Sequence, residues 1–136
     1  MAKTVRLDIV TPDKIVLSED VAMVIARATD GDIGILPGHA PLIAGLAIAP
    51  LRIIKDESEM QVSVGGGFIE VQADKITVLA GSAELPENID VNRAQAALER
   101  AEQRLKSGTD IDMTRAELAL RRAMTRLKVA EIAGKK

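Results

Sequence analysis

Five arginines in the last third of the chain are spaced so that they could act together. The spacing is seven residues from Arg93 to Arg100, then seven and four residues from Arg115 through Arg122 to Arg126. Residues three, four or seven positions apart share one face of an α-helix. If two such helices close against each other, four or five guanidinium groups converge, and they repel one another unless an anion lies among them. Because arginine suits phosphate oxygens, the pattern predicts a phosphate site or, alternatively, an ordinary solvated basic face.

Other residues that commonly perform chemistry are scarce. The 136-residue sequence has no cysteine, and His39 is its only histidine, which excludes disulfides, thiol catalysis and zinc sites built from thiolates or several histidines. The sequence holds no phosphate-loop motif and no nucleophilic serine motif. The three glycines at 65–67 precede an expected strand rather than a helix, which indicates a bulge or tight turn. A small enzyme is therefore the least supported class of function.

Charge is distributed unevenly along the chain. Residues 1–88 carry 7 basic and 13 acidic side chains, whereas residues 89–136 carry 11 basic and 7 acidic ones, which suggests two parts with different partners. The net charge of −2 and the single aromatic residue, Phe68, argue against nucleic acid as the anion. The sequence shows no secretory signal and no apolar run of the roughly 18 residues that span a bilayer. We expect a soluble cytoplasmic protein that reaches a membrane only through a partner.

The first part has the features of a β structure. Short apolar or alternating segments are separated by turn residues, and the expected strands cover residues 5–10, 21–28, 33–36, 51–54, 60–64, 68–72 and 76–80. Many short strands with frequent turns indicate an all-β sandwich or barrel.

The second part has the periodicity of helices. Apolar residues recur at steps of three and four from Val91 to Leu105 and again from Met113 to Ala130, which predicts two amphipathic helices. Residues 107–109 would end the first helix, and Asp110 or Asp112 would cap the second. The short connection predicts an antiparallel hairpin. Its alanine-rich stripes bury little apolar area, so the hairpin should be only marginally stable alone and able to exchange partners.

We therefore predict an α+β fold with two domains. An N-terminal all-β sandwich would cover residues 1–86, and a C-terminal antiparallel two-helix hairpin would cover residues 87–136. The arginines would then belong to the hairpin, beside its apolar seam.

Several runs of residues resemble one known family. They are residues 11–13 (TPD), 31–42 (GDIGILPGHAPL), 65–71 (GGGFIEV) and 115–120 (RAELAL), and in this order they resemble the epsilon subunits of bacterial F-type ATP synthases along essentially the whole chain. The resemblance implies a non-catalytic rotor subunit that attaches to the gamma subunit and to the membrane-embedded c-ring. It also implies a peripheral location on the cytoplasmic face of the cell membrane, and inhibition of ATP hydrolysis when the C-terminal helices extend toward the catalytic alpha and beta subunits. Asp32, in the loop that faces the c-ring in the family, would contact the ring.

A finer resemblance concerns ATP. Residues 89–94 (IDVNRA) are similar to the ATP-binding motif of Bacillus-type epsilon subunits. The resemblance implies that ATP is a regulatory ligand rather than a substrate, with Mg²⁺ as a possible companion. The residues implied to bind it are Glu84, Ile89, Asp90, Arg93, Ala94, Arg100, Arg122 and Arg126.

A stand-alone nucleotide sensor is the main competing hypothesis. It would use the same ATP site but would leave the acidic β part without a purpose. Co-purification with a gamma subunit would separate the two hypotheses.

Overall fold

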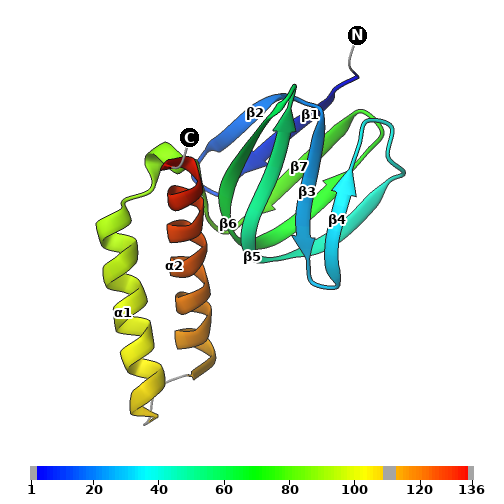
Figure 1. The fold of residues 1–136 in the computed structure, drawn as a ribbon. Coiled ribbons are helices and arrows are strands. Elements are labelled where there is room, and N and C mark those ends of the chain that lie inside the picture. The colour runs from blue at the N-terminus through cyan, green and yellow to red at the C-terminus, as the bar shows by residue number, and fades with distance from the viewer. Residues whose placement is uncertain (1–2, 109–112, 135–136) are drawn as a thin grey trace.

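The computed structural model describes residues 3–108 and 113–134, and it confirms a β part followed by two helices (Figure 1). The predicted cap at Asp110 or Asp112 lies outside the described residues. The strands are β1 (Val5–Val10), β2 (Ile15–Val21), β3 (Met23–Ala28), β4 (Gly31–Ile35), β5 (Leu42–Lys55), β6 (Ser58–Val71), β7 (Lys75–Ala80) and β8 (Ala83–Glu84). A 3₁₀ turn, η1 (Pro86–Asn88), leads into α1 (Val91–Ser107), and α2 (Met113–Gly134) completes the fold.

The strands form a continuous sheet that folds over into a sandwich (Figure 1). Their order is β2-β1-β7-β6-β5-β3-β4, with β8 added beside β6. Only the β1–β7 pair is parallel among the described strand pairs. Strand β6 changes its neighbour along its length. It pairs with β8 at Ser63 and Val64 and with β7 from Gly67 onward.

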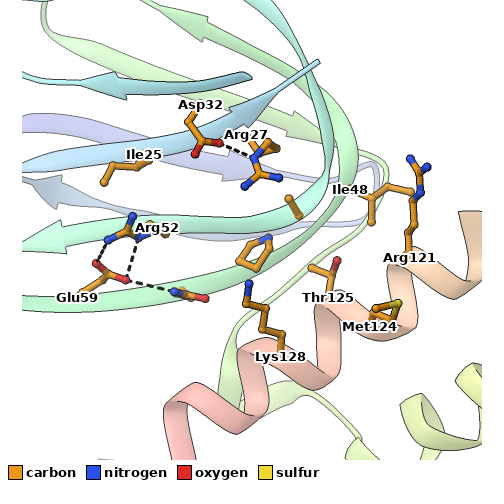
Figure 2. A pocket seen from close by; sticks show the side chains of 13 residues that line it. Ile25, Arg27, Asp32, Ile48, Arg52, Glu59, Arg121, Met124, Thr125 and Lys128 are labelled. Atoms are coloured by element: carbon orange, nitrogen blue, oxygen red, sulfur yellow. Dashed lines mark hydrogen bonds and ion pairs between the residues drawn. The ribbon is translucent and has the colours of Figure 1, made fainter. Parts of the chain in front are cut away.

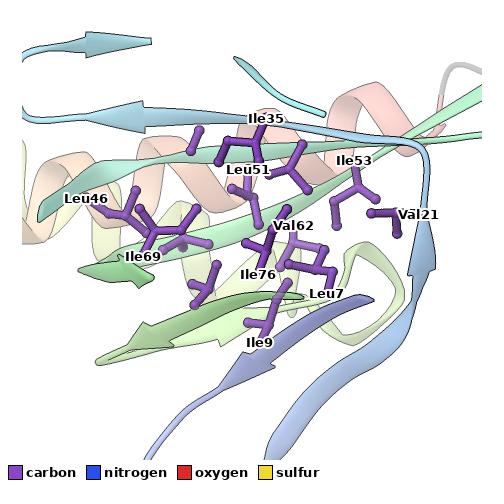
Figure 3. Close-up of a cluster of buried hydrophobic side chains, with 14 of the residues drawn as sticks. Leu7, Ile9, Val21, Ile35, Leu46, Leu51, Ile53, Val62, Ile69 and Ile76 are labelled. Atoms are coloured by element: carbon purple, nitrogen blue, oxygen red, sulfur yellow. The ribbon is translucent and has the colours of Figure 1, made fainter. Parts of the chain in front are cut away.

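Alternating side chains of the strands fill the space between the layers (Figure 3). Strand β1 shows the period of two most clearly, since Val5, Leu7 and Ile9 are buried while Arg6 is exposed. Every buried member of the main core cluster lies on a strand. The β part therefore has a hydrophobic core of its own, although the division into independent units at residue 86 stays a prediction.

The strand boundaries differ from the predicted ones in several places. The segments expected at 51–54, 60–64 and 68–72 belong to only two long strands, β5 and β6, which pair along nearly their whole length. The glycines at 65–67 do not end β6; they bend it, with φ of 88° at Gly66 and 145° at Gly67. The prediction also missed β2 and began the next strand at residue 21, whereas β3 begins at Met23.

Helix α2 lies between α1 and the sandwich (Figure 1). The helices meet along a seam of buried alanines: Ala94, Ala101, Ala116 and Ala123. The opposite face of α2 buries Thr125 and Val129 where the helix packs on β5 and β6. Helix α1 ends as predicted before Gly108, which has the left-handed conformation common after a helix. None of the helices within residues 3–108 and 113–134 is long and apolar enough to cross a bilayer.

The bend in β6 generates a stability prediction. A Cβ atom added at Gly67 would lie 2.1 Å from the Leu79 carbonyl oxygen, and its φ of 145° is unfavourable for other residues. We expect Gly67→Ala to lower the free energy of unfolding by at least about 2 kcal/mol, as measured by urea denaturation. Gly81→Ala is the matched control, because a Cβ atom there meets nothing within 4 Å. Equal midpoints for the two variants would contradict this account of the bend.

Candidate functional site

The segment that joins the sandwich to α1 positions several polar side chains. Strand β8 places Glu84 opposite Ser63 at the edge of the sheet, and the chain then turns through η1. Ile89 is buried, which anchors the backbone just before the helix. Asp90 is the N-cap of α1, and its carboxylate accepts a hydrogen bond of 3.0 Å from the Arg93 backbone N–H. This contact satisfies one of the free donors of the first helical turn.

A cavity of about 420 Å³ lies where this segment meets the two helices. Its lining residues are Glu84, Asn88, Asp90, Arg93, Ala94, Ala97, Arg100 and Arg126. The sandwich, the connecting segment, α1 and α2 all contribute to it, so its shape depends on the docked arrangement of both helices.

An ion pair between Glu84 and Arg126 links the sandwich to α2 across this cavity. The carboxylate of Glu84 accepts a hydrogen bond from Nε of Arg126, 42 residues away in the sequence, and both side chains are partly buried. Because both side chains are partly buried, salt screens this pair less than it would screen an exposed pair. The pair therefore orients the Arg126 guanidinium and fixes one wall of the cavity.

The structure brings together most of the residues implied to bind ATP. Six of the eight line the cavity, whereas Ile89 and Arg122 do not. Ile89 is instead a buried anchor. Arg122 is half-buried one turn before Arg126 on α2, so it lies next to the site rather than in its wall.

Two lining residues were absent from the prediction. Ala97 lies four residues after Arg93 and three before Arg100, so its position on the same helical face was available from the spacing. Its small side chain leaves room between the two arginines. Asn88 belongs to the irregular segment before the helix, where no periodicity could have indicated it.

The cavity has the chemistry of an anion site. Three guanidinium groups, from Arg93, Arg100 and Arg126, face two carboxylates, from Glu84 and Asp90. Guanidinium groups bind phosphate oxygens through paired, charge-assisted hydrogen bonds. A volume of about 420 Å³ falls within the range of roughly 300–1,000 Å³ for small-molecule sites. Among the described residues no group of three acidic or histidine side chains is arranged to hold a metal ion.

Asp32 lies apart from this cavity. It occupies strand β4 rather than the preceding turn, and it pairs with Arg27 of β3 at 2.5 Å (Figure 2). Both side chains are more than half exposed. The carboxylate is therefore available to a partner, but it already has a basic neighbour.

The sequence matches one protein family over nearly all of its length. The family described as the beta-sandwich domain of the ATP synthase delta/epsilon chain matches residues 4–86, and the long alpha-helix domain of the same chain matches residues 87–131. The ATP synthase epsilon chain of Bacillus subtilis is 53% identical over 108 residues, which are 79% of this chain and 82% of that one. The epsilon chain of Pelotomaculum thermopropionicum is 56% identical over 107 residues, 79% of this chain and 80% of that one.

Two solved ATP synthase structures contain a chain with a similar fold. A chain of the Euglena gracilis mitochondrial ATP synthase, in a cryo-EM structure of its OSCP, F1 and c-ring, superposes with a TM-score of 0.74 at 27% identity, covering 96% of this chain and 81% of that chain. A chain of the Tetrahymena thermophila central stalk and c-ring superposes with a TM-score of 0.58 at 16% identity, covering 96% of each chain, and this second likeness shows a shared fold alone. The family models and the bacterial relatives confirm the resemblance to ATP synthase epsilon subunits, whereas the finer resemblance to an ATP-binding motif stays a prediction.

The geometry of the N-cap allows the hydrogen bond of Asp90 to be tested separately from its negative charge. Asp90→Ala removes the hydrogen-bond acceptor and should lower the stability of α1 by about 1 kcal/mol, seen as faster hydrogen exchange of the α1 amides. Asp90→Asn keeps an acceptor of similar capping strength and should leave the exchange rates nearly unchanged. Equal losses in both variants would show that the negative charge, and not the cap, stabilises the helix.

Proposed function

Because the chain belongs to the delta/epsilon chain family of ATP synthases, we propose that it is a non-catalytic epsilon-type subunit of the central stalk of a proton-translocating F-type enzyme. Its sandwich would bind the gamma subunit and the c-ring, on the cytoplasmic face of the cell membrane, and would meet the membrane only through the complex. Its helical hairpin would inhibit ATP hydrolysis when it extends toward the catalytic alpha and beta subunits. Bound ATP would hold the hairpin compact and so relieve the inhibition.

The regulatory part of this proposal rests on the cavity lined by Arg93, Arg100 and Arg126, called the arginine cavity below. The residues present fit a nucleoside triphosphate, since Arg93, Arg100 and Arg126 line one cavity of suitable volume. Arg122, one turn before Arg126 on α2, can approach a phosphate chain from the cavity's edge. The carboxylate of Glu84 orients the Arg126 side chain, and the carboxylates of Glu84 and Asp90 would accept hydrogen bonds from the nucleoside. Mg²⁺ would enter with the phosphates, because magnesium sites commonly combine one or two carboxylates with phosphate oxygens.

The energetics of the hairpin support a clamp. The fully buried residues of the seam between the helices are alanines, which bury little apolar area at about 25 cal/mol per Å². Three guanidinium groups from both helices line the same cavity with two carboxylates, one of which pairs with Arg126. The closed arrangement therefore holds an excess of positive charge, which a bound anion would offset. A ligand that fills this cavity therefore favours the closed state over any open one.

The size of the effect is adequate for regulation. A ligand at 100 times its dissociation constant stabilises the state that binds it by about 2.7 kcal/mol. Such a difference changes a two-state population ratio about a hundredfold, provided that the open state does not bind ATP. The cellular ATP concentration could then set the fraction of extended, inhibitory hairpins.

The clamp predicts a specific pattern of ATP affinities. Arg93→Ala and Arg126→Ala should each weaken ATP binding by about tenfold or more, because each removes charge-assisted hydrogen bonds to phosphate. Isothermal titration calorimetry of the isolated chain, with and without Mg²⁺, measures this. Lys106→Ala is the control, since Lys106 is an exposed cation in the last turn of α1 that lies outside the cavity and on a different helical face from Arg93 and Arg100. Unchanged affinity in both cavity variants would refute the clamp.

The proposed c-ring contact has its own test. Asp32→Lys should cost the isolated protein less than about 1 kcal/mol, because its pair with Arg27 is exposed. In the assembled enzyme it should reduce ATP-driven proton pumping, measured in inverted vesicles at equal subunit content. Glu57→Lys, in the exposed β5–β6 turn, controls for the charge reversal. Normal pumping in the Asp32 variant would show that this carboxylate is not a functional ring contact.

A further inference from the structure

A second cavity, of about 630 Å³, lies on the other side of α2. It opens between this helix and strands β3, β4, β5 and β6, as Figure 2 shows. Its helical wall comes from Arg121, Met124, Thr125 and Lys128, which project from the face of α2 roughly opposite Arg126. This cavity is therefore separate from the arginine cavity described above, although the same helix walls both.

Two of the four cationic side chains that line this cavity are paired closely with carboxylates, and two are not. On the sheet side, Arg27 is paired with Asp32 at 2.5 Å, and Arg52 makes two bonds of 2.8 and 3.1 Å to Glu59 (Figure 2). On the helix side, Lys128 makes no ion pair with any residue that the structure describes. Among the described residues, the ion-pair contact of Arg121 is a long one of 3.7 Å to Glu117, with both side chains well exposed. The available positive charge is thus on α2.

The remaining wall is apolar or lacks a hydrogen-bond partner. Ile25, Ile48 and Pro50 line the sheet side, and Met124 faces them from α2 with 54% of its surface exposed. The side-chain oxygen of Gln61 is buried in the wall without a donor among the described residues, while its amide nitrogen donates to Glu59. Gln61 lines the cavity, so reorienting its amide would let the oxygen accept a hydrogen bond from an N–H or O–H group there, at the cost of the bond to Glu59.

We propose that this cavity binds a small amphipathic anion, with its acidic group between Arg121 and Lys128 and its apolar body against Ile48 and Met124. An N–H or O–H donor on the ligand would satisfy Gln61. A nucleoside triphosphate fits less well here, because two of the four cations are already neutralised by carboxylates and much of the wall is apolar.

Such a ligand would bind only while α2 is docked on the sandwich, because each side of the cavity belongs to one of these two parts. By linkage it would favour the compact hairpin in the same direction as ATP. The binding step stands on the cavity alone, whereas this regulatory consequence rests on the function proposed above.

Anilinonaphthalene sulfonate is a suitable probe because it joins a sulfonate, an N–H donor and an apolar ring system. We expect the probe to bind the full chain with one-to-one stoichiometry, as measured by the change in probe fluorescence. Lys128→Gln and Arg121→Gln should each weaken binding by about tenfold, and Arg104→Gln should leave it unchanged. The uncharged analogue N-phenylnaphthylamine should bind at least about tenfold more weakly than the sulfonate.

Methionine methyl groups locate the bound probe. With ¹³C-methyl methionine labelling, the probe should shift the Met124 signal and leave the signal of Met113, at the far end of α2, in place. Binding that is insensitive to Lys128→Gln, or that shifts both methionines equally, would overturn the proposal in favour of general adsorption to exposed apolar surface.

ATP calorimetry on the same samples separates this proposal from the previous one. Lys128→Gln lies outside the arginine cavity and should keep the wild-type ATP affinity. If the probe binds at Met124 but ATP does not bind the wild type, the second cavity stands and the clamp fails. If ATP binds but the probe does not, the clamp stands and the second cavity is refuted as a site.

Discussion

The docked position of α2 is the constraint on which the rest of the structure depends. This helix contacts α1 through Ala116 and Ala123, and it contacts the sandwich through Thr125 and Val129. The fully buried side chains of α2 in both contacts are small or medium in size. The partly buried Glu84–Arg126 pair adds a polar link from the sheet edge to the same helix. Under the clamp proposed above, a ligand of ordinary affinity would suffice to dock or release this helix, because the linkage energy of such a ligand is comparable to single interactions of this size.

Both cavities follow from this arrangement. The arginine cavity needs α1 and α2 together with the β8 edge, and the second cavity needs α2 against the sheet. Neither would persist if α2 left the sandwich. The sandwich core, in contrast, draws its buried members from strands, so we expect it to stay intact if the helices rearrange. Under the function proposed above, the sandwich would serve permanent attachment and the helices would serve regulation.

The sequence predicted the features that depend on local periodicity. The two helices, the alanine seam and the shared face of Arg93 and Arg100 follow from steps of three and four, and the structure shows them. Features set by contacts distant in the sequence were harder to predict. Residues 42–50 are almost continuously apolar, so no alternation marked them as part of β5. The second buried face of α2, at Thr125 and Val129, became visible only when the helix was seen to lie between two partners.

In the candidate site, too, local spacing was predictable from the sequence and contacts between distant residues were not. Family resemblance named Arg122 and Ile89 with the other ligand residues, yet the structure places one beside the cavity and the other in a buried anchor. The Glu84–Arg126 pair joins residues 42 positions apart, and no local pattern could reveal it. The pair requires β8 to place Glu84 at the sheet edge and α2 to return along it. Ala97 is the exception, because its spacing from Arg93 and Arg100 was sufficient to find it.

The most direct test of the account measures whether ATP closes the hairpin. The chain has no cysteine, so spin labels can be placed at Glu57→Cys in the β5–β6 turn and at Gln103→Cys on α1, both exposed positions outside the two helix-lined cavities. Pulsed electron spin resonance then gives the distribution of distances between the labels with and without ATP. The account predicts a broad or double distribution without ATP that narrows to the compact distance at saturating ATP, and that does not narrow when Arg126→Ala is added. A distribution that is the same with and without saturating ATP would contradict the central claim that the nucleotide holds the helices closed.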